Sequence, residues 1–370
     1  MKEWRLAFLY RPRASFAFGA LLWSATTCAQ SNVTLYGSLD SGFIYTNKTI
    51  DDATGKNSGK QFSLINSGME PSLFGMRGVE DLGGGLAAKF DLESGISVAN
   101  GGFDNSNGNL FGRQAWISLA SPYGEVKLGN QYSPFLFAMY DTDPRSFSQF
   151  GSAIGVYANN SFTGTYVSNA VSYKSPKIAG FTVDVMMALG GVAGNFKAGL
   201  QYSASLKYEF GGLLLNAAIE DEASSTDGAV NTGLFTSPVV ARTFGATYRF
   251  ASVNVKASFT NFNAPLTFNN GIRSGGDNNI YNLGADYYVL PTLDLNGGVW
   301  YVKDQHDSKS HSLIAAIGAV YSLSKRTSLY VQAGVLNNQG TENFGLAIDG
   351  ALYGARGTTV GTTLGVVHKF

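Results

Sequence analysis

The chain ends with Thr358-Thr359-Val360-Gly361-Thr362-Thr363-Leu364-Gly365-Val366-Val367-His368-Lys369-Phe370. Most of the large apolar side chains in this stretch stand at even-numbered positions, while the odd-numbered positions are mainly glycine, threonine and lysine. A period of two with one apolar face is typical of a half-buried strand. In hydrocarbon each unpaired backbone group costs roughly several kcal/mol, so a lipid-facing strand of this kind predicts a closed transmembrane β-barrel.

The same alternation recurs along the chain. In 198–209, Leu200 and Leu206 alternate with Gln201 and Lys207. We predict an all-β fold with sixteen antiparallel strands, at about 33–45, 61–79, 84–96, 111–120, 123–131, 167–174, 180–190, 198–209, 212–222, 238–250, 251–263, 278–289, 292–303, 311–323, 326–337 and 358–370.

The connections between these strands alternate between short and long. Tight links such as Ser121-Pro122 and Gly211-Gly212 are followed by longer polar ones. This alternation places all the long loops at one end of a meander, as in transmembrane barrels with tight periplasmic turns. The long loops are expected at about 46–60, 97–110, 132–166, 223–237, 264–277 and 338–357.

The strand number and the polar inward positions together predict a water-filled lumen, because a barrel of this size is too wide for side chains to fill. The longest loop, 132–166, combines aromatic residues such as Phe135 and Phe150 with Asp141, Asp143 and Arg145. Since its apolar side chains need a surface to pack on, we expect it to fold into the lumen. An external flap or a subunit contact is the alternative.

The amino terminus carries Lys2, Arg5, Arg11 and Arg13, followed by a short apolar stretch and Thr27-Cys28-Ala29. We interpret residues 1–29 as a secretory signal peptide and residues 30–370 as the barrel domain. Cys28 leaves a lipoprotein interpretation open, although the residues before it make a poor lipobox.

Composition excludes several classes of protein. The expected mature chain has no cysteine and a charge of about −3, so it offers neither a disulfide framework nor the basic excess of a nucleic-acid-binding protein. The three histidines are not spaced as metal ligands, and no nucleophile or nucleotide-binding motif is present. We therefore expect neither an enzyme nor a metal or cofactor site.

Several motifs together resemble the trimeric general porins of Gram-negative bacteria, in particular the beta-proteobacterial branch. The matching segments are residues 30–42, 75–86, 111–116, 123–129, 169–176 and 367–370. The resemblance implies a homotrimer in the outer membrane that contacts lipid and lipopolysaccharide and passes ions and small hydrophilic solutes. It also implies Phe370 as the signal for the barrel-assembly machinery.

In that family the third loop presents acidic groups opposite basic residues of the wall. Strand parity places Arg77, Lys89 and Lys127 on the polar faces of their strands. Asp141 and Asp143 are the corresponding acidic groups of the loop, with Arg145 beside them. For Arg77 and Lys89 a purely charge-balancing role stays open, and for the two aspartates so does turn capping before Pro144.

Three positions depart from the family pattern: Leu73, Asn130 and Tyr166 stand where arginines are often found. We therefore predict a weakly selective or mildly cation-preferring pore. Arg113 has the parity of outward residues, which places it in a subunit interface or shifts the predicted register by one. Tyr36 is interpreted as one of the aromatics at the membrane interface.

Two further functions stay open. One is a channel selective for sugars or aromatic acids, in which loop aromatics form a track. The other is a barrel that acts chiefly as an adhesin or phage receptor through 223–237 and 264–277.

Overall fold

The computed structural model describes residues 32–51, 54–160, 165–222, 239–269 and 271–370. The expected signal peptide and the expected loop 223–237 lie outside these ranges. The described strands are β1 (Asn32–Ile50), β2 (Asn57–Asn66), β3 (Leu73–Gly83), β4 (Leu86–Gly95), β5 (Gln114–Ser121), β6 (Gly124–Gln131), β7 (Val167–Lys174), β8 (Phe181–Ala188), β9 (Gln201–Phe210), β10 (Leu213–Glu222), β11 (Val239–Phe250), β12 (Val253–Asn269), β13 (Ile272–Leu290), β14 (Leu293–Asp304), β15 (His311–Ser322), β16 (Thr327–Gln339) and β17 (Gly357–Lys369). Helices α1 (Pro134–Thr142) and α2 (Ala153–Asn160) lie between β6 and β7.

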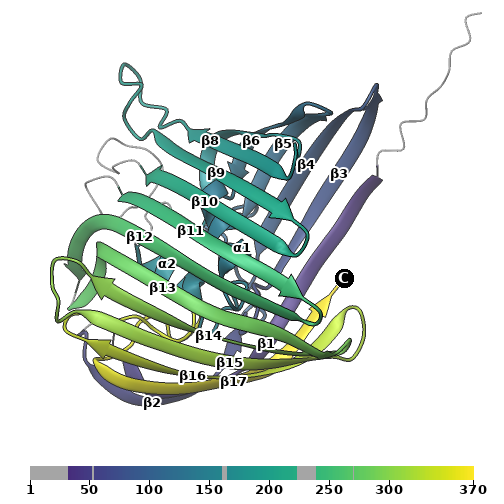
Figure 1. The fold of residues 1–370 in the computed structure, drawn as a ribbon. Helices are drawn as coiled ribbons and strands as arrows, with labels where there is room; N and C mark the ends of the chain where they lie inside the picture. Colours follow the sequence, from purple (N-terminus) through teal and green to yellow (C-terminus); the bar gives the residue numbers. More distant parts are fainter. Residues whose placement is uncertain (1–31, 52–53, 161–164, 223–238, 270) are drawn as a thin grey trace, which may run out of the picture.

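The strands form one antiparallel sheet that closes on itself. Successive strands are neighbours, and β1 pairs with β17 from Ser38 opposite Lys369 to Thr46 opposite Gly361. Figure 1 shows this seam, where the purple first strand runs beside the yellow carboxyl terminus. A closed sheet leaves no row of unpaired backbone groups facing lipid, so the predicted barrel is confirmed.

The seam is tight at Gly37. The backbone amide of Phe370 donates to the carbonyl of Gly37 at 3.0 Å, and the amide of Gly37 donates back at 3.2 Å. A Cβ at Gly37 would stand 2.4 Å from the Phe370 ring. Glycine is therefore required for the last aromatic residue to lie against the first strand.

Strands β2 and β3 share one barrel position, which keeps the number of positions at the predicted sixteen. Both pair with β1, and the seven steps from Asn66 to Leu73 lie opposite only three steps of β1, from Ser38 to Ser41. The prediction of one continuous strand over 61–79 is therefore wrong.

The interruption is held by the carboxylate of Asp40, which is buried on the inner face of β1. Its Oδ2 accepts hydrogen bonds from the amides of Met69 and Glu70, at 2.6 and 2.7 Å. Ser67 takes a positive φ of 62° at the start of the turn. These residues hold a turn in which the chain leaves the sheet between β2 and β3. After the turn, odd-numbered side chains face the interior in β3 as they do in β2.

Two predicted loops are mainly strand. β1 continues to Ile50, and the segment expected as loop 264–277 consists largely of the ends of β12 and β13, with Thr267 paired to Ser274. Polar residues suggested loops there, but water solvates both faces of a sheet beyond the membrane. Strands composed of polar residues can therefore stay hydrogen-bonded to each other in this region.

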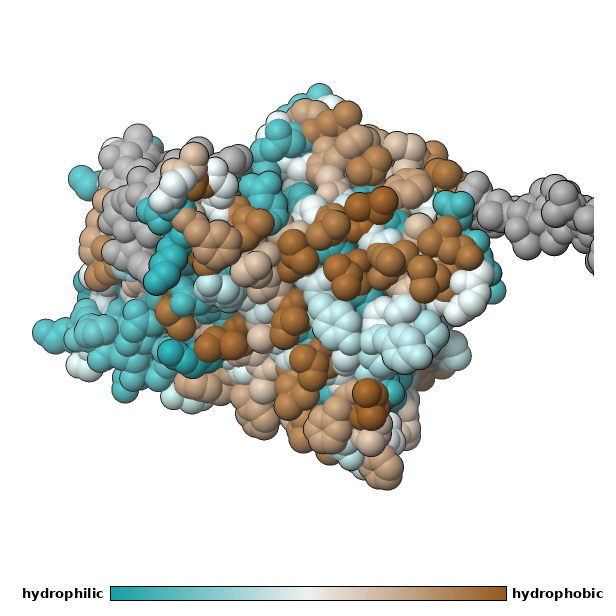
Figure 2. Space-filling model, turned by 90° about the horizontal axis from the view of Figure 1, so that it is seen from above, coloured by the Kyte–Doolittle hydropathy of each residue, from teal (hydrophilic) through white to brown (hydrophobic). Residues whose placement is uncertain are grey.

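Along the strands, exposed apolar side chains alternate with buried polar ones, as a barrel in lipid requires. In β13, Tyr281, Leu283 and Tyr287 are 48%, 61% and 46% exposed, whereas Asn282 and Asp286 between them are buried. Figure 2 shows hydrophobic residues spread over the broad centre of one face, with hydrophilic residues gathered toward its left margin. Within the described residues, no helix has the length and apolar character needed to span a membrane.

Candidate functional site: the inner wall and the segment against it

The inner faces of β3 to β7, called the open wall below, present charged side chains. Arg77 is exposed on β3, and its guanidinium lies 4.9 Å from the centre of the Tyr36 ring. Lys89 forms a 3.1 Å ion pair with Glu125, in which both side chains keep about a third to a quarter of their surface exposed. The Nζ of Lys127 lies 4.2 Å from the Trp116 ring. The structure therefore places the three predicted wall cations on one side of the barrel, as expected from parity.

Tyr36 lies on the inner wall, so its interpretation as an interfacial aromatic is wrong. Its hydroxyl donates to Asp91 at 2.6 Å and to Glu93 at 2.9 Å. Its parity with the buried Ser38 and Asp40 was the signal that could have placed it inside. Aromatic rings here hold Arg77 and Lys127 by cation–π contact.

Residues 132–160 lie against the inner faces of β9 to β16, called the covered wall below. Helix α1 contacts β8 to β12, and α2 contacts β13. The hydroxyl of Ser133 caps α1 by accepting from the Leu136 amide at 3.1 Å, and Pro134 follows at the first turn. The partners of this segment on the strands have the parity opposite to the exposed apolar side chains, so its contacts are with the interior.

Asp143 organises this segment and is fully buried. Its carboxylate accepts from the backbone amides of Phe147 at 2.9 Å and Ala153 at 3.0 Å, and from the indole Nε1 of Trp300 at 2.9 Å. Burial raises the pKa of this carboxyl, and the hydrogen bonds oppose that rise. A side chain enclosed in this way anchors the loop and does not face solvent.

Arg145 is likewise buried, with 6% of its surface exposed. Its Nε donates to Asn296 at 2.9 Å, and its other nitrogens donate to Gln332 and to the carbonyls of Phe150 and Gly151. Burial lowers the pKa of Arg145 to about 10. The guanidinium joins the loop to β14 and β16.

Asp141 stands at the edge of the covered wall. Its carboxylate pairs with Lys207 of β9 at 2.5 Å and accepts from Asn216 of β10 at 3.1 Å. About a fifth of the Asp141 side chain stays exposed. Of the two predicted loop carboxylates, this one is presented to the lumen.

Arg113 was expected either in an outward subunit interface or as a sign of a register shifted by one, and both alternatives are wrong because its side chain is buried among inward partners. Strand β5 begins one residue later, at Gln114, and the Arg113 side chain turns inward. Its Nε forms a 2.7 Å ion pair with Glu93, and its Nη2 donates to the Tyr132 hydroxyl at 2.8 Å. Outward parity does not apply to a residue that precedes the strand.

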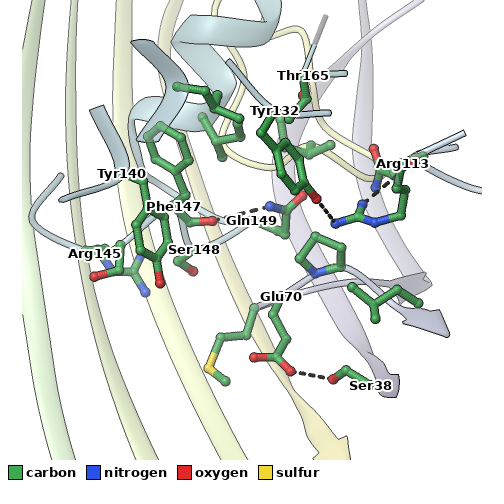
Figure 3. Close-up of a pocket in the computed structure, with 18 of the residues that line it drawn as sticks. Ser38, Glu70, Arg113, Tyr132, Tyr140, Arg145, Phe147, Ser148, Gln149 and Thr165 are labelled. Carbon is green, nitrogen blue, oxygen red and sulfur yellow. Dashed lines mark hydrogen bonds between the residues drawn. The ribbon is translucent and has the colours of Figure 1, made fainter. Parts of the chain in front are cut away.

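A cavity of about 750 Å³ lies between the loop and the wall. Figure 3 shows the cavity bounded by Tyr132, Tyr140 and Phe147 of the loop and by Arg113 and Glu70. The carboxylate of Glu70 accepts a hydrogen bond from the Ser38 hydroxyl. Phe137 and Tyr140 are each 47% exposed. The described lining thus sets aromatic rings of the loop opposite polar and charged groups of the wall.

Two of the three positions that depart from the family pattern line this cavity. These are Leu73 and Tyr166, and the Tyr166 hydroxyl hydrogen-bonds with Arg113. Asn130 instead donates to the carbonyl of Gly112 at 2.8 Å, beside the turn into β5.

Sequence reasoning missed Trp300 and Lys256. Lys256 is buried on the inner face of β12, and its Nζ donates to the Asp143 carbonyl at 3.1 Å and to Ser146 at 2.6 Å. A tryptophan beside Gly298 and a lysine beside Ser258, at inward parity on their strands, were the available signal. Side chains as large as Trp300 and Lys256 on the inner face need a packing or hydrogen-bonding partner that the sheet itself does not supply.

A closed barrel with charged side chains on its inner wall and a loop packed against that wall has the architecture of a pore. Residues 14–341 match the family model described as Gram-negative porin, and the chain belongs to that family. It is an outer-membrane protein whose fold and family are those of a channel.

Comparison with individual proteins agrees with this family assignment. The chain is similar to outer membrane porin protein 32 of Delftia acidovorans, with 30% identity over 97% of this chain and 99% of that protein. It is 28% identical to an outer membrane porin protein of Bordetella pertussis, over 92% of this chain and 95% of that one. Among solved structures, the anion-selective porin from Comamonas acidovorans superimposes with a TM-score of 0.75 at 28% identity, over 92% of this chain and all of that one. The trimer form of OmpT from Vibrio cholerae shares the fold, with a TM-score of 0.65 at 15% identity over 92% and 99% of the two chains.

Proposed function

We propose that this porin is a general diffusion channel narrowed by residues 132–160 to the space along the open wall. The observation that carries the proposal is the division of the inner wall, since the two helices of the loop contact β8 to β13 and the partly exposed charges of β3 to β7 lie on the remaining part of that wall. Arg77, Lys89 and Lys127 on one side and Asp141 on the other then set a field across the passage. Asp143 and Arg145 contribute by holding the loop in place.

We propose weak selectivity or a mild preference for cations. Leu73 and Tyr166 contribute no positive charge to the cavity, and the wall cation Lys89 is already paired with Glu125. The anion-selective structure named above therefore does not determine the sign for this chain.

Reversal potentials of single channels in a salt gradient test this preference. We expect a value near zero or of cationic sign, and Leu73→Arg should move it toward anion preference. Leu73→Gln, which adds polarity without charge, is the matched control and should leave it unchanged. A strong chloride preference of the unaltered channel would refute the proposal.

A substrate-selective channel is the second candidate, favoured by the exposed rings of Phe137 and Tyr140 at the cavity. Liposome swelling with graded solutes separates the two. Rates that fall smoothly with solute size support general diffusion, whereas saturation by aromatic acids or sugars supports a binding site.

We also propose a homotrimer, like the trimer form of OmpT that shares this fold, together with contact to outer-membrane lipid and lipopolysaccharide. Phe370 would be read by the assembly machinery after removal of residues 1–29. Cross-linking of the purified protein tests the trimer, and amino-terminal sequencing of the mature protein tests cleavage after Ala29.

A further inference from the structure

Two glutamates are buried side by side near the end of β10. Glu220 and Glu222 are 1% and 2% exposed, while Asp221 between them is exposed on the other face. Residues two apart on a strand point the same way, so both carboxyl groups face the interior. The burial of both glutamates follows from the register of β10, because a shift of one residue would turn them outward and bury Asp221 instead.

The surroundings of the pair offer oxygen atoms and few other polar groups. Glu220 lies opposite Ser203 of β9, and its strongest side-chain neighbours are Glu222 and the hydroxyls of Ser133 and Ser203. Gln201, also buried, has the same inward parity. The amino end of α1 covers the group, since the Phe135 amide donates to Ser203 at 3.0 Å.

Neither carboxylate oxygen of Glu220 makes a hydrogen bond of ordinary geometry with a described residue. The inward lysine of the neighbouring strand, Lys207, is committed to Asp141 at 2.5 Å. A buried carboxylate without a partner is costly, and two adjacent ones repel each other. The carboxyl group of Glu220 therefore requires either a cation or a shared proton.

We propose that Glu220 and Glu222 bind a hard divalent cation of the calcium type. The available donors are all oxygens, from two carboxylates, two hydroxyls and the amide of Gln201, and oxygen donors are what Ca²⁺ prefers. Among the described residues no third acidic or histidine side chain joins the pair, so neutral oxygens complete the set. Bound there, the ion ties the start of α1 to β9 and β10.

The test uses full-length mature protein refolded without lipopolysaccharide, which itself binds calcium. After EDTA treatment, binding of ⁴⁵Ca²⁺ and thermal unfolding with and without 1 mM Ca²⁺ (on the order of extracellular levels for weak calcium sites) are measured. We expect about one bound ion per chain and a higher unfolding temperature in calcium. Glu220→Gln and Glu222→Gln should abolish both effects.

Asp221→Asn is the matched control, because it removes a carboxylate from the same strand on the opposite face, and it should retain the ion. If the unaltered protein binds no calcium and Glu220→Gln is more stable than it in EDTA, the pair shares a proton and the proposal fails. Equal calcium binding by all three variants would also overturn it. A failure here leaves the channel function untouched, since conductance is not the readout.

Discussion

The open wall and the covered wall carry the same kinds of charged residue but use them differently. On the open wall, Lys89 and Glu125 form a partly exposed pair on the inner face of the barrel. On the covered wall, Lys256 and Asp143 are enclosed and hold a segment of chain in place. The comparison shows that burial by the loop, more than residue type, decides whether a charge stays exposed to the lumen or holds a segment of chain in place.

The strongest test of this difference is Asp143→Ala. It leaves the Trp300 indole and several backbone amides buried without an acceptor, which costs on the order of 3–5 kcal/mol for such a network. We expect faster hydrogen exchange over 132–160 and larger, noisier channel currents.

Asp141→Ala is the control for that substitution. Its pair with Lys207 is partly solvated, so the cost should stay at about 1 kcal/mol or less. Similar exchange and current noise in the two variants would erase the distinction between the walls.

A buried cluster of three charged side chains, where β14 and β16 end, extends the comparison to pH. The Arg273 guanidinium contacts both Asp304 and Glu342, and burial raises the pKa of Glu342 from 4.5 to about 7. Because the folded state holds this proton more tightly, the stabilisation is complete below about pH 4 and is lost as the pH rises through 7.

The free-energy change from that group should be roughly 3 kcal/mol at most. We expect protection of amides in 340–356, corrected for intrinsic exchange rates, to fall between pH 5 and pH 8 (the range bracketing the raised value). Glu342→Gln should flatten the profile. An unchanged slope in that variant would assign the effect to another group.

The smallest effect on stability is expected at the open wall. Lys89→Gln should change the free energy of unfolding by about 1 kcal/mol or less. It should raise the cation-to-anion permeability ratio by roughly two- to fivefold, because a unit charge at 4 Å is worth about 1 kcal/mol in water. Glu125→Gln is the opposite control and should lower that ratio. If both variants leave it unchanged, the open wall does not set selectivity.

Strand parity could be predicted from the sequence because it depends on local alternation. It placed Arg77, Lys89 and Lys127 correctly on the inner face. The turn between β2 and β3 could not be predicted, since it is held by Asp40, almost thirty residues upstream.

The position of the loop 132–160 depends even more on residues that are distant in the sequence. Asp143 and Arg145 were expected at the constriction, yet Asp143 is fully buried, and Arg145 borders the cavity with only 6% of its surface exposed. Their partners Trp300 and Gln332 lie 157 and 187 residues away in the chain. Local patterns show which residues can face the lumen, but only the folded chain shows which of them are covered.

The contact between Gly37 and Phe370 has a consequence for synthesis. The first strand to leave the ribosome finds its final neighbour in the last one, so the cylinder cannot shut until translation has ended. Until then β1 lacks one of its two partners, and contacts so distant in sequence form slowly. The nascent chain must therefore be kept from pairing with other molecules over its whole time of export.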